Sequence, residues 1–206
     1  MSENPQSSPR PLRADAENSI ARILEAAERV FAADPTASLA AVAAAAGVAR
    51  TTVHRRFSSR EELRDALVDA VNAKLREAIA GANVGTAPPL AALYQLTVAT
   101  LDLKVDWRAS WQFVDQSGEG ARGVDPDSIA ALDSLLQRSL EAGLLRPGTD
   151  LRWTRDVYMA LLHEAATARP EGEDSAHRAN LVLQTLLRGV GSSEQGLGLD
   201  LSAPTS

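Results

Sequence analysis

Four arginines with no acidic residue between them form the clearest group of side chains that could do chemistry in this sequence. Arg50, Arg55, Arg56 and Arg60 all precede Glu61. Guanidinium groups donate hydrogen bonds to phosphate oxygens and to the exposed edge of guanine. The formal net charge of the chain is −6, so the positive charge is local, and a protein that coats nucleic acid over its whole surface is excluded.

Hydroxyl and imidazole groups accompany these arginines and add further donors. We expect contacts with double-stranded DNA from the basic and polar residues of this stretch, which are Arg50, Thr51, Thr52, His54, Arg55, Arg56 and Arg60. The alternative is that the basic run is an ordinary solvated helix face.

Residues 38–63 contain the elements that would position these side chains. Leu39, Val42 and Ala46 recur at helical spacing before Gly47, and glycine readily adopts the positive φ that ends a helix and opens a turn. Val53 and Phe57 lie four residues apart, so they share one face of a second short helix. The pattern predicts a helix-turn-helix whose polar face is free to contact DNA.

Longer helices are predicted on either side of this motif. Apolar residues between 20 and 31 follow the spacing of an amphipathic helix that ends before Asp34-Pro35. Ser59 with Glu62 is a capping-box pattern, which predicts that a long helix begins there and runs to about residue 80. The stretch 81–89 is rich in Gly and Pro and predicts a domain boundary.

Residues 20–67 resemble the DNA-binding domain of the tetracycline-repressor (TetR) family of bacterial transcription regulators. The resemblance rests on Ile23-Leu24-Glu25-Ala26-Ala27 and Phe31, on Ala46-Gly47-Val48-Ala49, on Thr52-Val53-His54-Arg55-Arg56-Phe57, and on Ser59-Arg60-Glu61-Glu62-Leu63. His54 and Arg56 stand where the family usually has tyrosines, and Thr51 stands where a glycine is common. The resemblance implies operator binding, but these departures mean that the operator sequence does not carry over from relatives.

The periodicity beyond residue 88 is helical throughout, so the fold is expected to be all-α with about nine helices. Five further helices are predicted at 88–104, 107–117, 126–144, 150–169 and 174–190. The expected organisation is a disordered arm (1–16), a DNA-binding domain with its connecting helix (17–80), a larger C-terminal domain (81–190) and a flexible tail (191–206). Arg10 and Arg13 of the arm could reach a minor groove, or the arm could be idle.

Apolar stripes on the last two predicted helices indicate a surface for a second copy of the chain. A four-helix bundle across a two-fold axis is also what the resemblance implies, and small residues on the stripes would let the helices approach closely. The predicted interface residues are Val157, Leu161, Ala179, Val182, Leu183 and Leu186. The alternative is that these stripes face only the core of their own chain.

Six of the eight aromatic residues lie between positions 94 and 158. A pocket lined by aromatic rings and a few polar groups suits a small apolar effector. The predicted ligand-binding residues are Tyr94, Trp107, Trp111, Gln112, Phe113, Tyr158 and His163. Each of the aromatic residues could instead be an ordinary core residue.

Other functional classes find little support in the sequence. The absence of cysteine excludes disulfides and thiolate zinc sites, and His163-Glu164 lacks the second histidine of a helical zinc motif. We therefore expect no cofactor or metal, no membrane span and a cytoplasmic location. The predicted function is a homodimeric, ligand-responsive regulator of transcription, more often a repressor than an activator. A helical protein-binding scaffold is the alternative, and an enzyme is the least supported.

Overall fold

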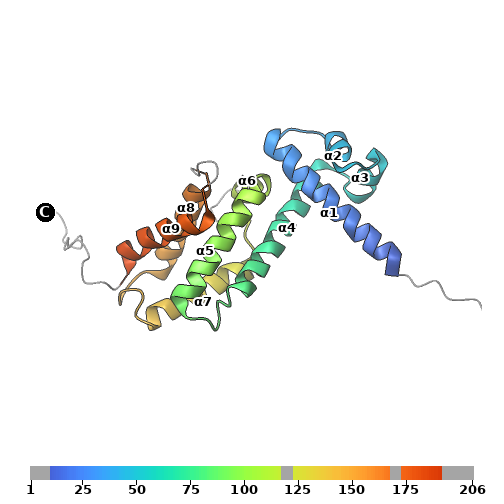
Figure 1. The fold of residues 1–206 in the computed structure, drawn as a ribbon. Coiled ribbons are helices and arrows are strands. Elements are labelled where there is room, and N and C mark those ends of the chain that lie inside the picture. The colour runs from blue at the N-terminus through green and yellow to red at the C-terminus, as the bar shows by residue number, and fades with distance from the viewer. Residues whose placement is uncertain (1–9, 117–122, 168–172, 192–206) are drawn as a thin grey trace, which may run out of the picture. The chain divides into compact units, whose positions relative to one another are not determined.

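The computed structural model describes residues 10–116, 123–167 and 173–191. Nine α-helices occur in these residues (Figure 1), as the predicted all-α fold requires. Their bounds are α1 (Arg10–Ala33), α2 (Leu39–Ala46), α3 (Arg50–Arg56), α4 (Arg60–Gly81), α5 (Pro89–Asp106), α6 (Arg108–Gln116), α7 (Pro126–Glu141), α8 (Leu151–Thr167) and α9 (Ser175–Val190). None of these helices combines the length and the apolar content needed to span a bilayer.

The helices form two compact units that are not contiguous in sequence. The first unit contains α1, α2, α3, the part of α4 up to Val71, and α6. The second contains the rest of α4, from Asn72, together with α5, α7, α8 and α9. The sequence predicted one domain boundary between residues 80 and 81. The structure instead divides α4 between the two units after Val71 and places α6 with the N-terminal helices.

Helix α1 is longer than the sequence pattern indicated. It begins at Arg10, so residues 10–16 are helical and their assignment to a disordered arm was wrong. Pro11 is compatible with this start, since the missing N–H of proline has no partner to lose in the first turn of a helix. The remaining arm residues, 1–9, and the tail residues 192–206 lie outside the described residues, so their predicted disorder stays a prediction.

The core of the first unit combines side chains from all of its helices. Phe31 of α1 lies edge-on to Phe113 of α6, with ring centroids 5.7 Å apart. Around this pair lie Ile23, Ala26, Ala27, Val42, Val53, Leu63, Leu67 and Ala109, all with no exposed surface. The two short helices α2 and α3 therefore share one core with α1, α4 and α6 rather than packing only on each other.

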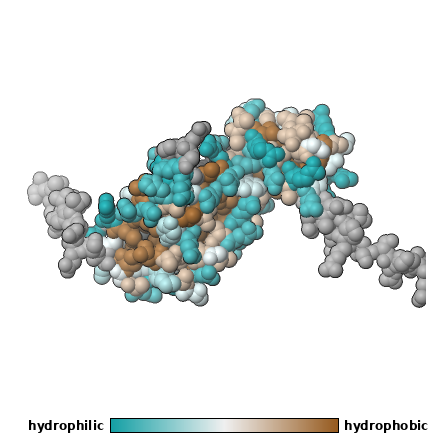
Figure 2. Space-filling model, in the orientation of Figure 1, coloured by the Kyte–Doolittle hydropathy of each residue, from teal (hydrophilic) through white to brown (hydrophobic). Residues whose placement is uncertain are grey.

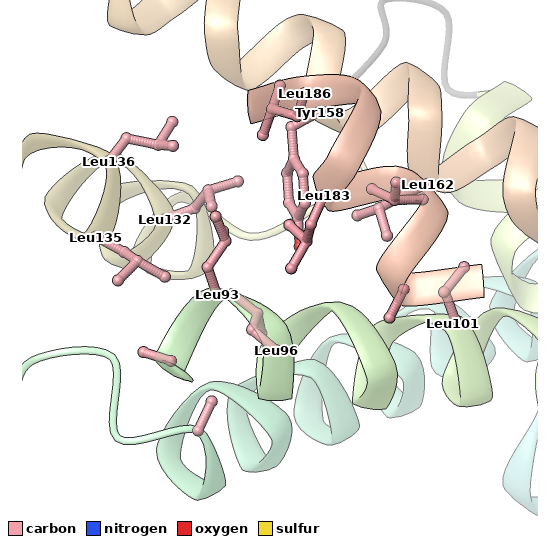
Figure 3. Close-up of a cluster of buried hydrophobic side chains, with 14 of the residues drawn as sticks. Leu93, Leu96, Leu101, Leu132, Leu135, Leu136, Tyr158, Leu162, Leu183 and Leu186 are labelled. Atoms are coloured by element: carbon pink, nitrogen blue, oxygen red, sulfur yellow. The ribbon is translucent and has the colours of Figure 1, made fainter. Parts of the chain in front are cut away.

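The core of the second unit is built mostly from leucines (Figure 3). They come from α5, α7, α8 and α9, and include Leu93, Leu96, Leu101, Leu132, Leu135, Leu136, Leu162, Leu183 and Leu186. Tyr158 is buried among them, and its hydroxyl lies 3.0 Å from the Thr97 Oγ1 atom. Burial raises the pKa of Tyr158 well above its ordinary range, although the hydrogen bond with Thr97 opposes the shift.

Candidate nucleic-acid interface

The corner of the predicted helix-turn-helix is made by Gly47. Its φ and ψ are 65° and 35°, and its N–H donates to carbonyl oxygens of the last turn of α2. The positive φ expected at this position is confirmed. A second contact closes the same corner, because Nη2 of Arg22 on α1 donates to the Ala46 carbonyl at 2.9 Å. The end of α2 is thus attached to α1 and the entry to α3 is set.

The face of α3 that points into the unit is apolar, as predicted. Val53 has no exposed surface, and Phe57, which follows the helix, is 6% exposed. Arg50, Thr51, His54 and Arg55 are exposed, whereas Thr52 and Arg56 are half-buried. The burial of Val53 thus leaves a polar and basic surface available to a ligand outside the unit.

Two of the exposed residues on α3 interact with each other. The Arg50 Nε atom donates to the His54 Nε2 atom at 3.3 Å, one helical turn further on. The His54 Nε2 atom is the acceptor in this contact. The pair holds two potential donors to DNA on the same side of the helix.

Arg60 is not a free surface arginine. Its guanidinium donates to the Pro35 carbonyl and lies over the Phe31 ring, 5.6 Å from the centroid. Its predicted contact with DNA stays a prediction, and the structure gives it a second role. It joins the start of α4 to the loop that follows α1.

Two carboxylates stabilise the loops that flank the interface. Hydrogen bonds from the Thr36 hydroxyl and the Thr36 N–H lower the pKa of Asp34. Hydrogen bonds from the Ser58 hydroxyl and the Ser58 N–H lower the pKa of Glu62 in the same way. The Glu62 N–H in turn donates to the Ser59 Oγ atom at 3.1 Å. The predicted capping pattern is present, but the carboxylate of Glu62 reaches Ser58 instead of Ser59.

Glu28 on α1 binds the start of α6 within the first unit. It is 6% exposed and accepts hydrogen bonds from the Ala109 N–H at 2.5 Å, the Ser110 N–H at 3.0 Å and the Ser110 hydroxyl at 2.6 Å. The carboxylate therefore caps the first turn of α6. Sequence reasoning missed this contact. The available signal was an acid three residues before Phe31, on the apolar side of the helix.

Helix α4 also contacts α6. The Arg64 guanidinium carbon lies 4.3 Å from the centroid of the Phe113 ring. Phe113 is thus covered by a cation on α4 and by the edge of Phe31 on α1. Both contacts belong to the unit that carries α3, so α6 supports the DNA-binding face.

The predicted ligand-binding residues do not gather at one site. Phe113 and Trp107 pack in the core of the first unit, and their placement in an effector domain was wrong because α6 belongs to the first unit. Trp111 is buried in α6, Gln112 and His163 are exposed, and Tyr158 is enclosed in the second core. Tyr94 lines an open groove between α5 and α9.

Four of the six predicted interface residues are core residues of their own chain. Ala179, Val182, Leu183 and Leu186 are at most 5% exposed in the single chain, so they are unavailable to a second copy. Their stripe packs against helices of the same unit. For these four residues the alternative given in the sequence analysis therefore applies, namely that the stripe faces the core of its own chain. Val157 and Leu161 are partly buried. The large apolar side chains that α8 and α9 do expose are Trp153 and Leu181, at 64% and 42%.

Comparison with known proteins agrees with this architecture. The profile of the tetR family of bacterial regulatory proteins matches residues 23–67, which extend from α1 into α4. The chain is 32% identical over 173 residues to the HTH-type transcriptional repressor LfrR of Mycolicibacterium smegmatis, covering 82% of this chain and 88% of that protein. It is 27% identical over 175 residues to the HTH-type transcriptional regulator NfxB of Pseudomonas aeruginosa, covering 82% and 92%.

A solved structure of the first relative shows the same fold. The crystal structure of the TetR-like regulator LfrR from Mycobacterium smegmatis in complex with proflavine matches with a TM-score of 0.62 and 30% identity, covering 84% of this chain and 96% of that one. The all-α fold of this chain therefore agrees with that of LfrR. The chain therefore belongs to the TetR family of bacterial transcription regulators, and its helix-turn-helix is a DNA-binding motif.

Proposed function

We propose that the protein represses transcription by binding a double-stranded operator as a homodimer, and that a small molecule bound in the second unit releases it. The observation that carries the proposal is the outward face of α3, where Arg50, His54 and Arg55 are exposed above the buried Val53. The helix contains no acidic residue among its seven. Its field is therefore attractive to phosphate along its whole length.

Recognition by two copies follows from the size of this face. A helix of seven residues reaches only a few base pairs, and a two-fold dimer places a second helix about one DNA turn, roughly 34 Å, away. The exposed Trp153 and Leu181 provide apolar surface on α8 and α9 for such a dimer, together with the partly buried Val157 and Leu161. This set replaces the four buried residues of the sequence-based prediction.

Release by a small molecule requires a difference in ligand affinity between two conformations. An effector that binds better to the form unsuited to the operator shifts the population away from DNA. The complex of LfrR with proflavine shows that a regulator of this architecture accepts a small aromatic compound. We expect the present protein to act in the same general way in the cytoplasm, without catalytic activity.

Arg55→Ala tests the assignment of the DNA-binding face. Fluorescence anisotropy would measure its binding to a fragment of the gene's own promoter and to random DNA. If Arg55 contacts a base, the variant loses about 1–3 kcal/mol of operator binding and discriminates less between the two DNAs. Arg152→Ala, at an exposed position on α8, removes the same charge from the second unit and serves as the control.

Two results would count against the proposal. If Arg55→Ala and Arg152→Ala both bind the promoter fragment as the parent does, α3 does not read DNA. If the parent protein sediments as a monomer at micromolar concentration and on operator DNA, the two-fold arrangement is wrong.

A further inference from the structure

The groove between α5 and α9 is an open apolar site in the second unit. It has a volume of about 780 Å³, within the range of roughly 300–1,000 Å³ typical of pockets for small molecules. Its apolar lining includes Leu90, Tyr94, Leu183 and Leu187. Leu90 is 50% exposed, and Figure 2 shows hydrophobic surface gathered over this part of the molecule.

The charge of the groove is one-sided. Arg188 is the charged residue among those that line it, and the other polar side chains there are the amides of Asn180 and Gln184. Arg188 is exposed in the last turn of α9, and within the described part of the chain it forms no ion pair or hydrogen bond. The apolar groove thus has at its edge a guanidinium that has no partner among the described residues.

The end of α9 does not cancel this positive charge. A helix C-terminus carries partial negative charge on its free carbonyls. Here, however, the Val190 carbonyl accepts a hydrogen bond from the Arg146 N–H at 3.0 Å, and the Gly189 carbonyl accepts one from the Arg146 guanidinium. Two of the last carbonyls of α9 are therefore already paired.

We propose that this groove binds an amphiphilic organic anion, such as a medium-chain carboxylate, with its head group on Arg188 and its chain along the leucines. An apolar body removes the exposed part of Leu90 and Leu187 from water, and a carboxylate satisfies the guanidinium with a charge-assisted hydrogen bond. An organic cation of the same shape would meet Arg188 with the wrong sign. The groove therefore selects by head-group charge as well as by apolar bulk.

Binding in the groove does not depend on the proposed function, although its regulatory consequence does. If the groove is the effector site, the anion lowers operator affinity by the same factor by which operator lowers affinity for the anion. Anion binding without any change in operator affinity would leave the groove assigned and would place the effector elsewhere. The two proposals therefore fail separately.

Isothermal titration calorimetry of the full chain with decanoate and with decyltrimethylammonium tests the inference, because the two probes share a chain length and differ in head-group charge. We expect decanoate to bind measurably more tightly. Arg188→Gln should weaken decanoate about fivefold and leave the cation unchanged or slightly improved. Arg152→Gln, which removes the same charge from an exposed position outside the groove, should bind decanoate as the parent does.

A second variant tests whether the loss of the Arg188 charge itself weakens decanoate binding. Ala91 is exposed and lines the groove, so Ala91→Glu should pair with Arg188 and weaken decanoate without loss of helical circular dichroism. Equal binding of the two probes, no decanoate binding, or an unchanged affinity in both variants would overturn the inference. It would also be overturned if decanoate binds only after residues 192–206 are removed, because the chain's own tail would then be the occupant.

Discussion

Replacing Glu28 with alanine should be one of the most damaging single changes in the first unit. The carboxylate is 6% exposed and accepts three hydrogen bonds from the start of α6. Alanine leaves two backbone N–H groups and one hydroxyl without their acceptor. Ala109 and Ser110 have no exposed surface, so water cannot replace the acceptor without opening the core.

The expected cost follows from the number and kind of these bonds. A hydrogen bond to a charged group contributes about 1.5–3 kcal/mol, and the three share one carboxylate, so their contributions do not add. Each buried donor left without an acceptor costs about 1–3 kcal/mol, so the total for the three donors is roughly 3–5 kcal/mol. We expect Glu28→Ala to lower the free energy of unfolding by about that amount, and Glu28→Gln by about half, since the amide retains one oxygen acceptor.

Urea unfolding followed by circular dichroism and tryptophan fluorescence measures this effect. Trp107 and Trp111 report on the region of α6, whereas Trp153 lies in the second unit. Glu25→Ala is the matched control, because Glu25 is exposed on the same helix and the substitution changes helix propensity equally. Protein concentration must be held constant, since a dimer is further stabilised at higher concentration.

The reasoning would be refuted by a small difference between the two alanine variants. If the free energies of unfolding of Glu28→Ala and Glu25→Ala differ by less than about 0.5 kcal/mol, the Glu28 carboxylate contributes no more to stability than a surface acid. A full loss with Glu28→Ala and none with Glu28→Gln would show instead that side-chain volume, rather than charge, holds α6.

Three further predictions concern smaller contacts. Gly47→Ala should destabilise the protein by about 1 kcal/mol in urea unfolding, because alanine is strained at a φ of 65°, whereas Gly81→Ala should be tolerated; equal effects would contradict this. The folded-state pKa of Glu62 lies below its usual 4.5, so its contribution to stability is present above that pH and is lost as the pH falls through the folded pKa. Ser58→Ala should raise that pKa in an NMR titration, and an unchanged value would dismiss the Ser58 hydroxyl as a cause. Tyr158→Phe should cost about 1 kcal/mol in thermal unfolding, since one buried hydrogen bond is lost, and a stabilised variant would argue against that bond.

Local sequence patterns were sufficient to predict the DNA-binding motif. The position of Gly47 and the spacing of Val53 and Phe57 depend on neighbours within a few residues, so the turn and the buried face of α3 could be inferred without tertiary information. The helices beyond residue 88 were also located, with ends displaced by up to about three residues. The start of α7 was predicted at residue 126, and in the structure Asp125 caps the helix and Pro126 is its first residue.

The partners of the apolar faces could not be predicted in the same way. Periodicity identifies which face of a helix is apolar, but it does not identify what covers that face. Leu183 and Leu186 were therefore assigned to a second copy, although they pack in their own chain. The contact between Glu28 and Ser110 joins residues 82 positions apart, and no pattern local to either residue indicates the other.

The interleaving of the two units affects how the protein can be made and divided. The segment from Trp107 completes a unit whose other residues end at Val71, so 35 residues of the second unit, Asn72–Asp106, are synthesised in between. Until residues 109–113 have left the ribosome, the Glu28 carboxylate lacks the donors of α6 and Phe31 lacks its contact with Phe113. A fragment that ends after α4 would carry the whole helix-turn-helix and still lack part of its own core. The DNA-binding unit is thus discontinuous, and it cannot be isolated by a single cut of the chain.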